Sequence, residues 1–132
     1  MKLLVVNPNS SETVTSAIMD SAKRGASAGT KLVGVTTKGE TRNIDSAFGD
    51  YLSGAFMIRT CLEAVEVHKP DAVVLAGFGR VGIDALKEAL TIPVVSIAES
   101  SMAIACLLGH RFTTLTMLQQ FIPYQQDLVR KS

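Results

Sequence analysis

Residues 71–82 read Asp71-Ala-Val-Val-Leu-Ala-Gly-Phe-Gly-Arg-Val-Gly82, an apolar run that leads directly into a glycine-rich loop. The apolar run is typical of a strand that is buried on both faces of a parallel sheet. The loop matches the G-x-G-x-x-G pattern of dinucleotide sites, and Glu99 follows at a fitting distance. Taken alone, this segment predicts an α/β fold that binds a dinucleotide.

The glycine pattern is weak evidence by itself, because glycines allow a tight strand-to-helix turn in any α/β domain. The loop follows the third predicted strand, and only about fifty residues remain after it for a second nucleotide-binding half. A dinucleotide site therefore ranks below the other functional alternatives. Arg80 in this loop can clamp an anion bidentately, although an isolated surface arginine is usually solvated.

Short apolar runs alternate with longer amphipathic segments along the chain. They predict strands at residues 3–6, 31–36, 72–76, 93–97 and 112–116. They predict helices at about residues 12–24, 48–68, 83–90, 102–108 and 117–131. Strict alternation predicts a flavodoxin-like α/β fold, with a parallel sheet, right-handed crossovers and helices on both faces. Five such units are enough for a complete sheet of strand order 2-1-3-4-5.

Composition excludes several classes of protein. The chain has 132 residues, of which 47% are hydrophobic and 19% charged, so one folded domain is expected rather than a disordered chain. The net charge is +1 and the basic residues are scattered, so neither nucleic acid nor a membrane is an expected partner. Cys61 and Cys106 have no metal-site spacing, and we expect both to be buried structural thiols in a cytoplasmic protein.

Ligands of parallel α/β sheets bind beyond the carboxyl ends of the strands. The segments to consider are therefore residues 7–11, 37–45, 77–82 and 98–101. The first is rich in short polar side chains that favour an anion at a helix N-terminus, and a well-capped helix, with Ser10 or Ser11 as the cap, explains it equally well. Ser100 and Ser101 are candidate caps of the fourth helix. The predicted ligand-binding residues are Asn7, Asn9, Ser10, Gly77, Phe78, Gly79, Glu99 and Ser100.

Four segments together support a family resemblance. They are residues 2–11 with their Asn-Pro-Asn-Ser loop, residues 71–90, residues 92–102 and residues 107–114. In order and spacing they resemble the hydantoin/allantoin racemase branch of the aspartate/glutamate racemases. The resemblance implies cofactor-free racemisation of amino acids or their derivatives, with one cysteine removing the α-proton and a second returning a proton to the opposite face. It also implies two flavodoxin-like halves with the site between them.

The chain departs from this family pattern at two places. The family has a cysteine at the tip of the third strand, in an Ala-Cys-Phe-Gly-like context, where this chain has Gly77. The family's acidic residue two positions after the Phe is Arg80 in this chain. Family chains are also longer, and their second cysteine lies in a half that this sequence does not reach. Since Cys61 and Cys106 match neither position, the resemblance implies a racemase-family protein that lacks both proton carriers.

Two organisations fit these observations. In the first, residues 1–98 form a racemase-like α/β domain, and residues 99–132 either begin a second half-domain or close the first domain. In the second, the chain is a complete five-stranded domain that binds a nucleotide, a flavin or another phosphorylated ligand without catalysis. In the first case the strand at 112–116 lacks its neighbours, which predicts a homo-oligomer. A small-molecule ligand is expected, and no metal or other cofactor.

Overall fold

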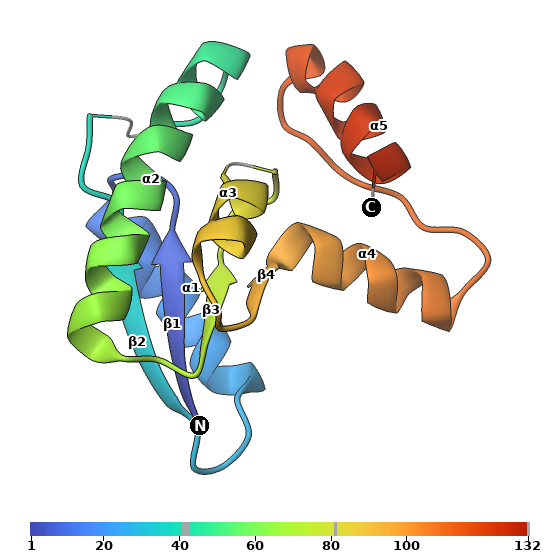
Figure 1. Ribbon diagram of the computed structural model, residues 1–132. Coiled ribbons are helices and arrows are strands. Elements are labelled where there is room, and N and C mark those ends of the chain that lie inside the picture. Colours follow the sequence, from blue (N-terminus) through green and yellow to red (C-terminus); the bar gives the residue numbers. More distant parts are fainter. Residues whose placement is uncertain (41–42, 81, 132) are drawn as a thin grey trace.

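A computed structural model describes residues 1–40, 43–80 and 82–131 (Figure 1). The elements are β1 (Lys2–Asn7), α1 (Glu12–Gly25), β2 (Lys31–Thr36), α2 (Ala47–His68), β3 (Ala72–Leu75), α3 (Ile83–Ala89), β4 (Val94–Ser96), α4 (Ile97–Leu108), the 3-10 turn η1 (Gln119–Phe121) and α5 (Ile122–Lys131). Parts of the expected loop at 37–45 and of the glycine loop, residues 41, 42 and 81, lie outside the described residues, as does residue 132.

The four strands form one parallel sheet in the order β2-β1-β3-β4. Helix α1 covers one face, and α2 and α3 cover the other (Figure 1). This confirms the predicted α/β class with helices on both faces. In the register of the sheet Val6 pairs with Leu75, so the carboxyl ends of β1 and β3 lie side by side. The loops that follow these two strands must therefore meet.

The main core lies between the sheet and helices α2 and α3. Alternate strand residues such as Leu4 and Val6 point to this face and are fully buried. The cluster consists of Leu4, Val6, Met57, Cys61, Ala64, Val73, Leu75, Ile83, Leu86 and Val94. Burial of each large side chain contributes about 1.5–3 kcal/mol, so this cluster fixes α2 and α3 against the strands.

The predicted strand at residues 112–116 is wrong. These residues have no regular secondary structure, because α4 leads the chain away from the edge of β4 and leaves them without a neighbouring strand in the described part of the chain (Figure 1). A strand exists only where another strand receives its hydrogen bonds. The predicted five-stranded order 2-1-3-4-5 is wrong for the same reason. The described residues therefore do not support a complete five-stranded domain. The last helix also begins later than predicted, at Ile122.

Helix α4 begins at Ile97, earlier than the predicted residue 102, and so the segment 98–101 is its first turn rather than a loop. The hydroxyl of Ser96 accepts a hydrogen bond from the backbone N–H of Glu99 at 3.1 Å. Ser96 is therefore the N-cap, and the expectation for Ser100 and Ser101 is wrong. The spacing Ser-x-x-Glu is a known signal of a helix start, and here it overlaps the end of an apolar strand.

The two cysteines have different surroundings. Cys61 is fully buried in the core, as predicted, and burial raises the pKa of its thiol to about 11. Cys106 is exposed, so the prediction for it is wrong. The reason is that α4 buries only Ala98 and Met102, which pack on Leu128 of α5 in a small second cluster. In the described ranges, no group of acidic, cysteine or histidine side chains has a metal-binding arrangement, and no helix has the length and apolarity of a membrane span.

Candidate functional site

The loops after β1 and β3 meet in a cavity of about 130 Å³, which we call the tip cavity. Three of the predicted ligand-binding residues, Gly77, Phe78 and Gly79, line it. The remaining lining residues are Pro8, Ile44, Asp50, Phe121 and Tyr124. The structure therefore brings the predicted third-strand tip together with α2 and with the η1–α5 segment, which the sequence did not connect to the site.

Asn7 fixes the shape of the first loop from inside. Its side chain is buried, and its amide group donates to Asn9 Oδ1 at 2.9 Å, to the Ser11 carbonyl at 3.1 Å and to Thr15 Oγ1 at 3.0 Å. Its side-chain oxygen accepts from the Asn9 backbone N–H at 3.1 Å. Ser11 is the N-cap of α1, as one of the two alternatives predicted. Both polar groups of the Asn7 side chain are thus hydrogen-bonded within the loop and the start of α1. Ser10, in the same loop, is half-buried.

The glycines of the G-x-G-x-x-G pattern are explained in part by packing within the chain. A Cβ atom on Gly77 would lie 2.7 Å from Cγ of Pro8, which is far closer than carbon atoms can pack. Pro8 is itself held by its carbonyl, which accepts a hydrogen bond from the Ser53 hydroxyl. Gly82 has a φ of 63°, and its Cβ would lie 2.8 Å from Met57 Cε. Close contacts between elements thus account for two of the three glycines without a dinucleotide.

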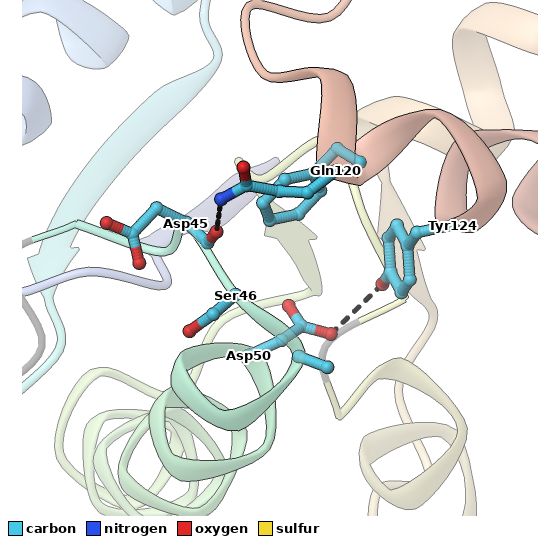
Figure 2. A pocket seen from close by; sticks show the side chains of 7 residues that line it. Asp45, Ser46, Asp50, Gln120 and Tyr124 are labelled. Atoms are coloured by element: carbon cyan, nitrogen blue, oxygen red, sulfur yellow. Dashed lines mark hydrogen bonds between the residues drawn. The ribbon is translucent and has the colours of Figure 1, made fainter.

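Figure 2 shows the lining of a second cavity of about 320 Å³, which we call the α2 cavity. Its lining consists of Asp45, Ser46, Ala47, Asp50, Gln120, Phe121 and Tyr124. Ser46 caps α2 by accepting from the Gly49 N–H at 3.1 Å, and the Gln120 amide donates to the Asp45 carbonyl at 3.0 Å. The two cavities share Asp50, Phe121 and Tyr124.

Asp50 and Tyr124 form a hydrogen-bonded pair at the boundary between the cavities (Figure 2). The Tyr124 hydroxyl donates to Asp50 Oδ2 at 3.0 Å and accepts from the backbone N–H of Arg80 at 3.1 Å. Burial raises the pKa of Asp50, and the hydrogen bond from Tyr124 offsets only part of this effect. Burial is also the main reason why the pKa of Tyr124 is raised. The pair links α2, the glycine loop and α5.

Neither member of this pair was predicted from the sequence. Asp50 lies in the first turn of α2, which starts at the carboxyl edge of the sheet. This position alone could have indicated Asp50 as a candidate site residue. Tyr124 lies on α5, whose packing no local pattern specifies. Phe78 is also fixed by α5, because its carbonyl accepts from the Gln125 amide at 3.5 Å. The η1–α5 segment is therefore a part of the site.

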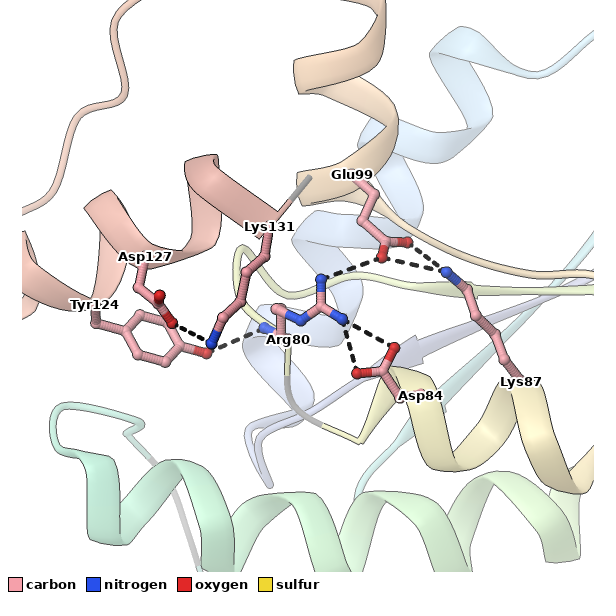
Figure 3. A network of polar contacts seen from close by, with 7 residues as sticks. All are labelled: Arg80, Asp84, Lys87, Glu99, Tyr124, Asp127 and Lys131. Atoms are coloured by element: carbon pink, nitrogen blue, oxygen red, sulfur yellow. Dashed lines mark hydrogen bonds and ion pairs between the residues drawn. The ribbon is translucent and has the colours of Figure 1, made fainter.

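Arg80 and Glu99 belong to a charged network outside the tip cavity (Figure 3). The Arg80 guanidinium donates to both oxygens of Asp84, at 3.0 and 2.7 Å, and lies 3.9 Å from Glu99 Oε1. Lys87 donates to both oxygens of Glu99, at 3.2 and 2.9 Å. Carboxylates of the chain itself therefore occupy the predicted anion clamp. Neither Glu99 nor Ser100 is among the described residues that line the tip cavity.

Comparison with known proteins identifies the family. The family model described as Asp/Glu/Hydantoin racemase matches residues 3–132. Hydantoin racemases of Pseudomonas sp. (strain NS671) and Paenarthrobacter aurescens are 36% and 30% identical to this chain over 98% and 100% of its length, and 51% and 56% of their own. The crystal structure of an allantoin racemase from Pseudomonas fluorescens covers 99% of this chain, with a TM-score of 0.93 and 32% identity.

An allantoin racemase from Klebsiella pneumoniae has a similar structure, with a TM-score of 0.94 and 27% identity. This chain covers 53% of that protein and 55% of the Pseudomonas fluorescens one. It thus spans about half the length of the curated relatives it matches. The match in fold extends through α4 and α5, so the predicted resemblance is confirmed for the whole chain. The chain belongs to the Asp/Glu/hydantoin racemase family.

Proposed function

We propose that this chain binds an amino-acid derivative of the hydantoin or allantoin class at the tips of β1 and β3, and does not racemise it through thiols. The observation that carries the proposal is the tip cavity, which Gly77, Phe78 and Gly79 line in a chain of the racemase family. Parallel α/β sheets bind their ligands at this edge.

Thiol-based racemisation needs a thiolate that takes the α-proton from one face and a thiol that gives a proton to the other. Gly77 has no side chain that can carry a proton. Cys61 is enclosed in the core, and the raised pKa of its thiol keeps it protonated near neutral pH. Cys106 lies on the exposed part of α4. No cysteine is among the described residues that line the tip cavity. We therefore expect the chain to bind its ligand without a cofactor and to turn it over little or not at all.

The proposal extends to the organisation of the chain. Residues 1–98 form the racemase-like α/β domain, and residues 99–132 begin a second half. In this second part Leu107, Leu115 and Met117 are 86%, 91% and 99% exposed. Such apolar side chains favour association, so we propose that the chain forms a homo-oligomer. We also propose that it works in the cytoplasm.

An optically pure 5-substituted hydantoin and optically pure allantoin, each incubated with the protein in heavy water, test the proposal. Binding is measured by calorimetry and by the shift in melting temperature, since a ligand that binds the folded state stabilises it. Exchange of the α-proton is followed by NMR against buffer alone. We expect saturable binding with no exchange above the buffer rate. Failure of both ligands to bind would refute the binding function, and catalysed exchange would refute the absence of turnover.

A further inference from the structure

The shared wall of the two cavities contains one half-buried carboxylate. Asp50, Phe121 and Tyr124 line both the tip cavity and the α2 cavity. The tip cavity reaches Gly77 and Gly79, and the α2 cavity reaches the start of helix α2 (Figure 2). A ligand that occupies both cavities must therefore pass the carboxylate of Asp50.

This carboxylate is oriented and has one free oxygen. Oδ2 accepts the hydroxyl hydrogen of Tyr124, whose own oxygen is engaged by the Arg80 N–H, so the phenol is fixed from two sides. Oδ1 has no hydrogen-bond partner in the described part of the chain, and no cation of that part pairs with Asp50. A carboxylate oxygen has two acceptor sites. Asp50 is thus held ready to accept hydrogen bonds from a ligand.

The chemistry of the two cavities limits what the ligand can be. A carboxylate that is half-buried repels anionic groups and favours N–H donors, with which it forms charge-assisted hydrogen bonds. The tip cavity is small and has glycines, Pro8 and Phe78 in its wall, which suit a compact planar group. The α2 cavity adds apolar surface from Ala47 and Phe121, which suits a side chain attached to that group.

We propose that Asp50 anchors a ureide ligand, cyclic or linear, by accepting the N–H hydrogens of its ureido group through Oδ1, and that Tyr124 is the positioning residue that orients this carboxylate. The inference rests on the proposed function and names the group that selects the ligand. Phosphorylated ligands are disfavoured at this place, because a phosphate group and the Asp50 carboxylate are both negatively charged and repel each other.

Two variants separate recognition from folding. Asp50→Asn keeps the size of the side chain and can still accept the Tyr124 hydroxyl, but it removes the charge and can place an NH₂ group against the ligand's donors. Because burial disfavours the charged form of Asp50, this variant is expected to melt no lower than the wild type near neutral pH. Tyr124→Phe keeps the ring and removes the hydroxyl. The matched control is Asp20→Asn, on the exposed surface of α1.

Calorimetry measures the binding of two probes, a 5-substituted hydantoin and the same hydantoin methylated on both nitrogens. We expect Asp50→Asn to weaken binding of the first probe at least tenfold and Tyr124→Phe to weaken it about threefold to tenfold, whereas Asp20→Asn leaves it unchanged. The dimethylated probe is expected to bind the wild type at least tenfold more weakly than the first probe.

The outcomes distinguish this inference from the proposed function. Equal binding of the hydantoin by the wild type and by a folded Asp50→Asn variant overturns the role of Asp50 and leaves the binding function in place. Equal binding of both probes by the wild type overturns the recognition of N–H groups. A wild type that binds no hydantoin and no allantoin overturns the proposed function and this inference with it.

Discussion

Substitution of Gly77 by alanine tests how tightly the first and third strand tips are packed. The new Cβ atom would lie 2.7 Å from Cγ of Pro8 and 3.5 Å from its Cδ. Non-bonded carbon atoms prefer about 3.5–4.0 Å, so the proline must move by roughly 1 Å. Its ring cannot rotate away like a flexible side chain, and its carbonyl is fixed by the Ser53 hydroxyl. The substitution therefore strains both loops.

The expected loss of stability follows from two opposing effects. Inserting a methyl group into a packed site costs about 1–3 kcal/mol. Replacing glycine where φ is not positive, as at Gly77, stabilises by about 0.4–1 kcal/mol because the unfolded chain loses freedom. The net loss is about 1–2 kcal/mol. With a urea m-value of about 2 kcal/mol per molar, the unfolding midpoint should fall by about 0.5–1 M.

Urea titration followed by circular dichroism measures the effect in a double-mutant cycle. Pro8→Ala removes the atom that the new Cβ meets, so the double variant should recover about 1 kcal/mol relative to the sum of the single variants. Gly25→Ala is the control, because its Cβ would meet nothing within 4 Å. Additive losses, or an unchanged midpoint in Gly77→Ala, would show that the two tips do not restrict each other. If the contact is confirmed, Gly77→Cys is best tested for α-proton exchange together with Pro8→Ala.

Leu86→Ala should lower the free energy of unfolding by about 2–5 kcal/mol, since Leu86 lies on α3 and is fully buried in the main core. Val67→Ala, where the side chain is 76% exposed, should change it by less than about 0.5 kcal/mol in the same titration, and equal effects would contradict the assigned core. A thiol reagent should label the native protein at the exposed Cys106. It should label the buried Cys61, whose thiol has a pKa of about 11, only after unfolding. Labelling of both thiols at the same rate in the native protein would refute this. Leu107→Gln should weaken self-association, as measured by light scattering, and a monomeric wild type would argue against association.

The four strands were predictable because each one is a short, mostly apolar run of residues. The observed β2 at Lys31–Thr36 coincides with its prediction. Residues 112–116 have a similar local pattern and form no strand, because a local pattern cannot say whether a neighbouring strand is present. The start of α4 was misplaced because Ser96 is at once the last residue of β4 and the cap of the helix.

The glycine loop was predictable as part of the site because parallel strands place their carboxyl ends on one edge. The pair of Asp50 and Tyr124 could not be predicted, because 74 positions of sequence separate the two residues and no spacing rule connects α2 to α5. Asn7 shows the opposite difficulty. Its residue type suggested contact with a ligand, but the structure uses its amide to close the loop over Thr15. Residue type at a strand tip does not distinguish a group that binds a ligand from one that shapes the loop.

In the proposed site, ligand recognition and thiol-based proton transfer would use different atoms, and this separation is the physical basis for the proposal of binding without turnover. The proposed recognition through Asp50 depends on α2 and on the contact of Asp50 with Tyr124. The family resemblance implies a thiol at position 77, where the Pro8 ring of this chain fills the space of a Cβ. Glycine at this position carries no proton, and the hydrogen bond between Tyr124 and Asp50 does not involve position 77. The proposed site therefore needs no thiol at position 77 in order to discriminate ligands by their N–H groups.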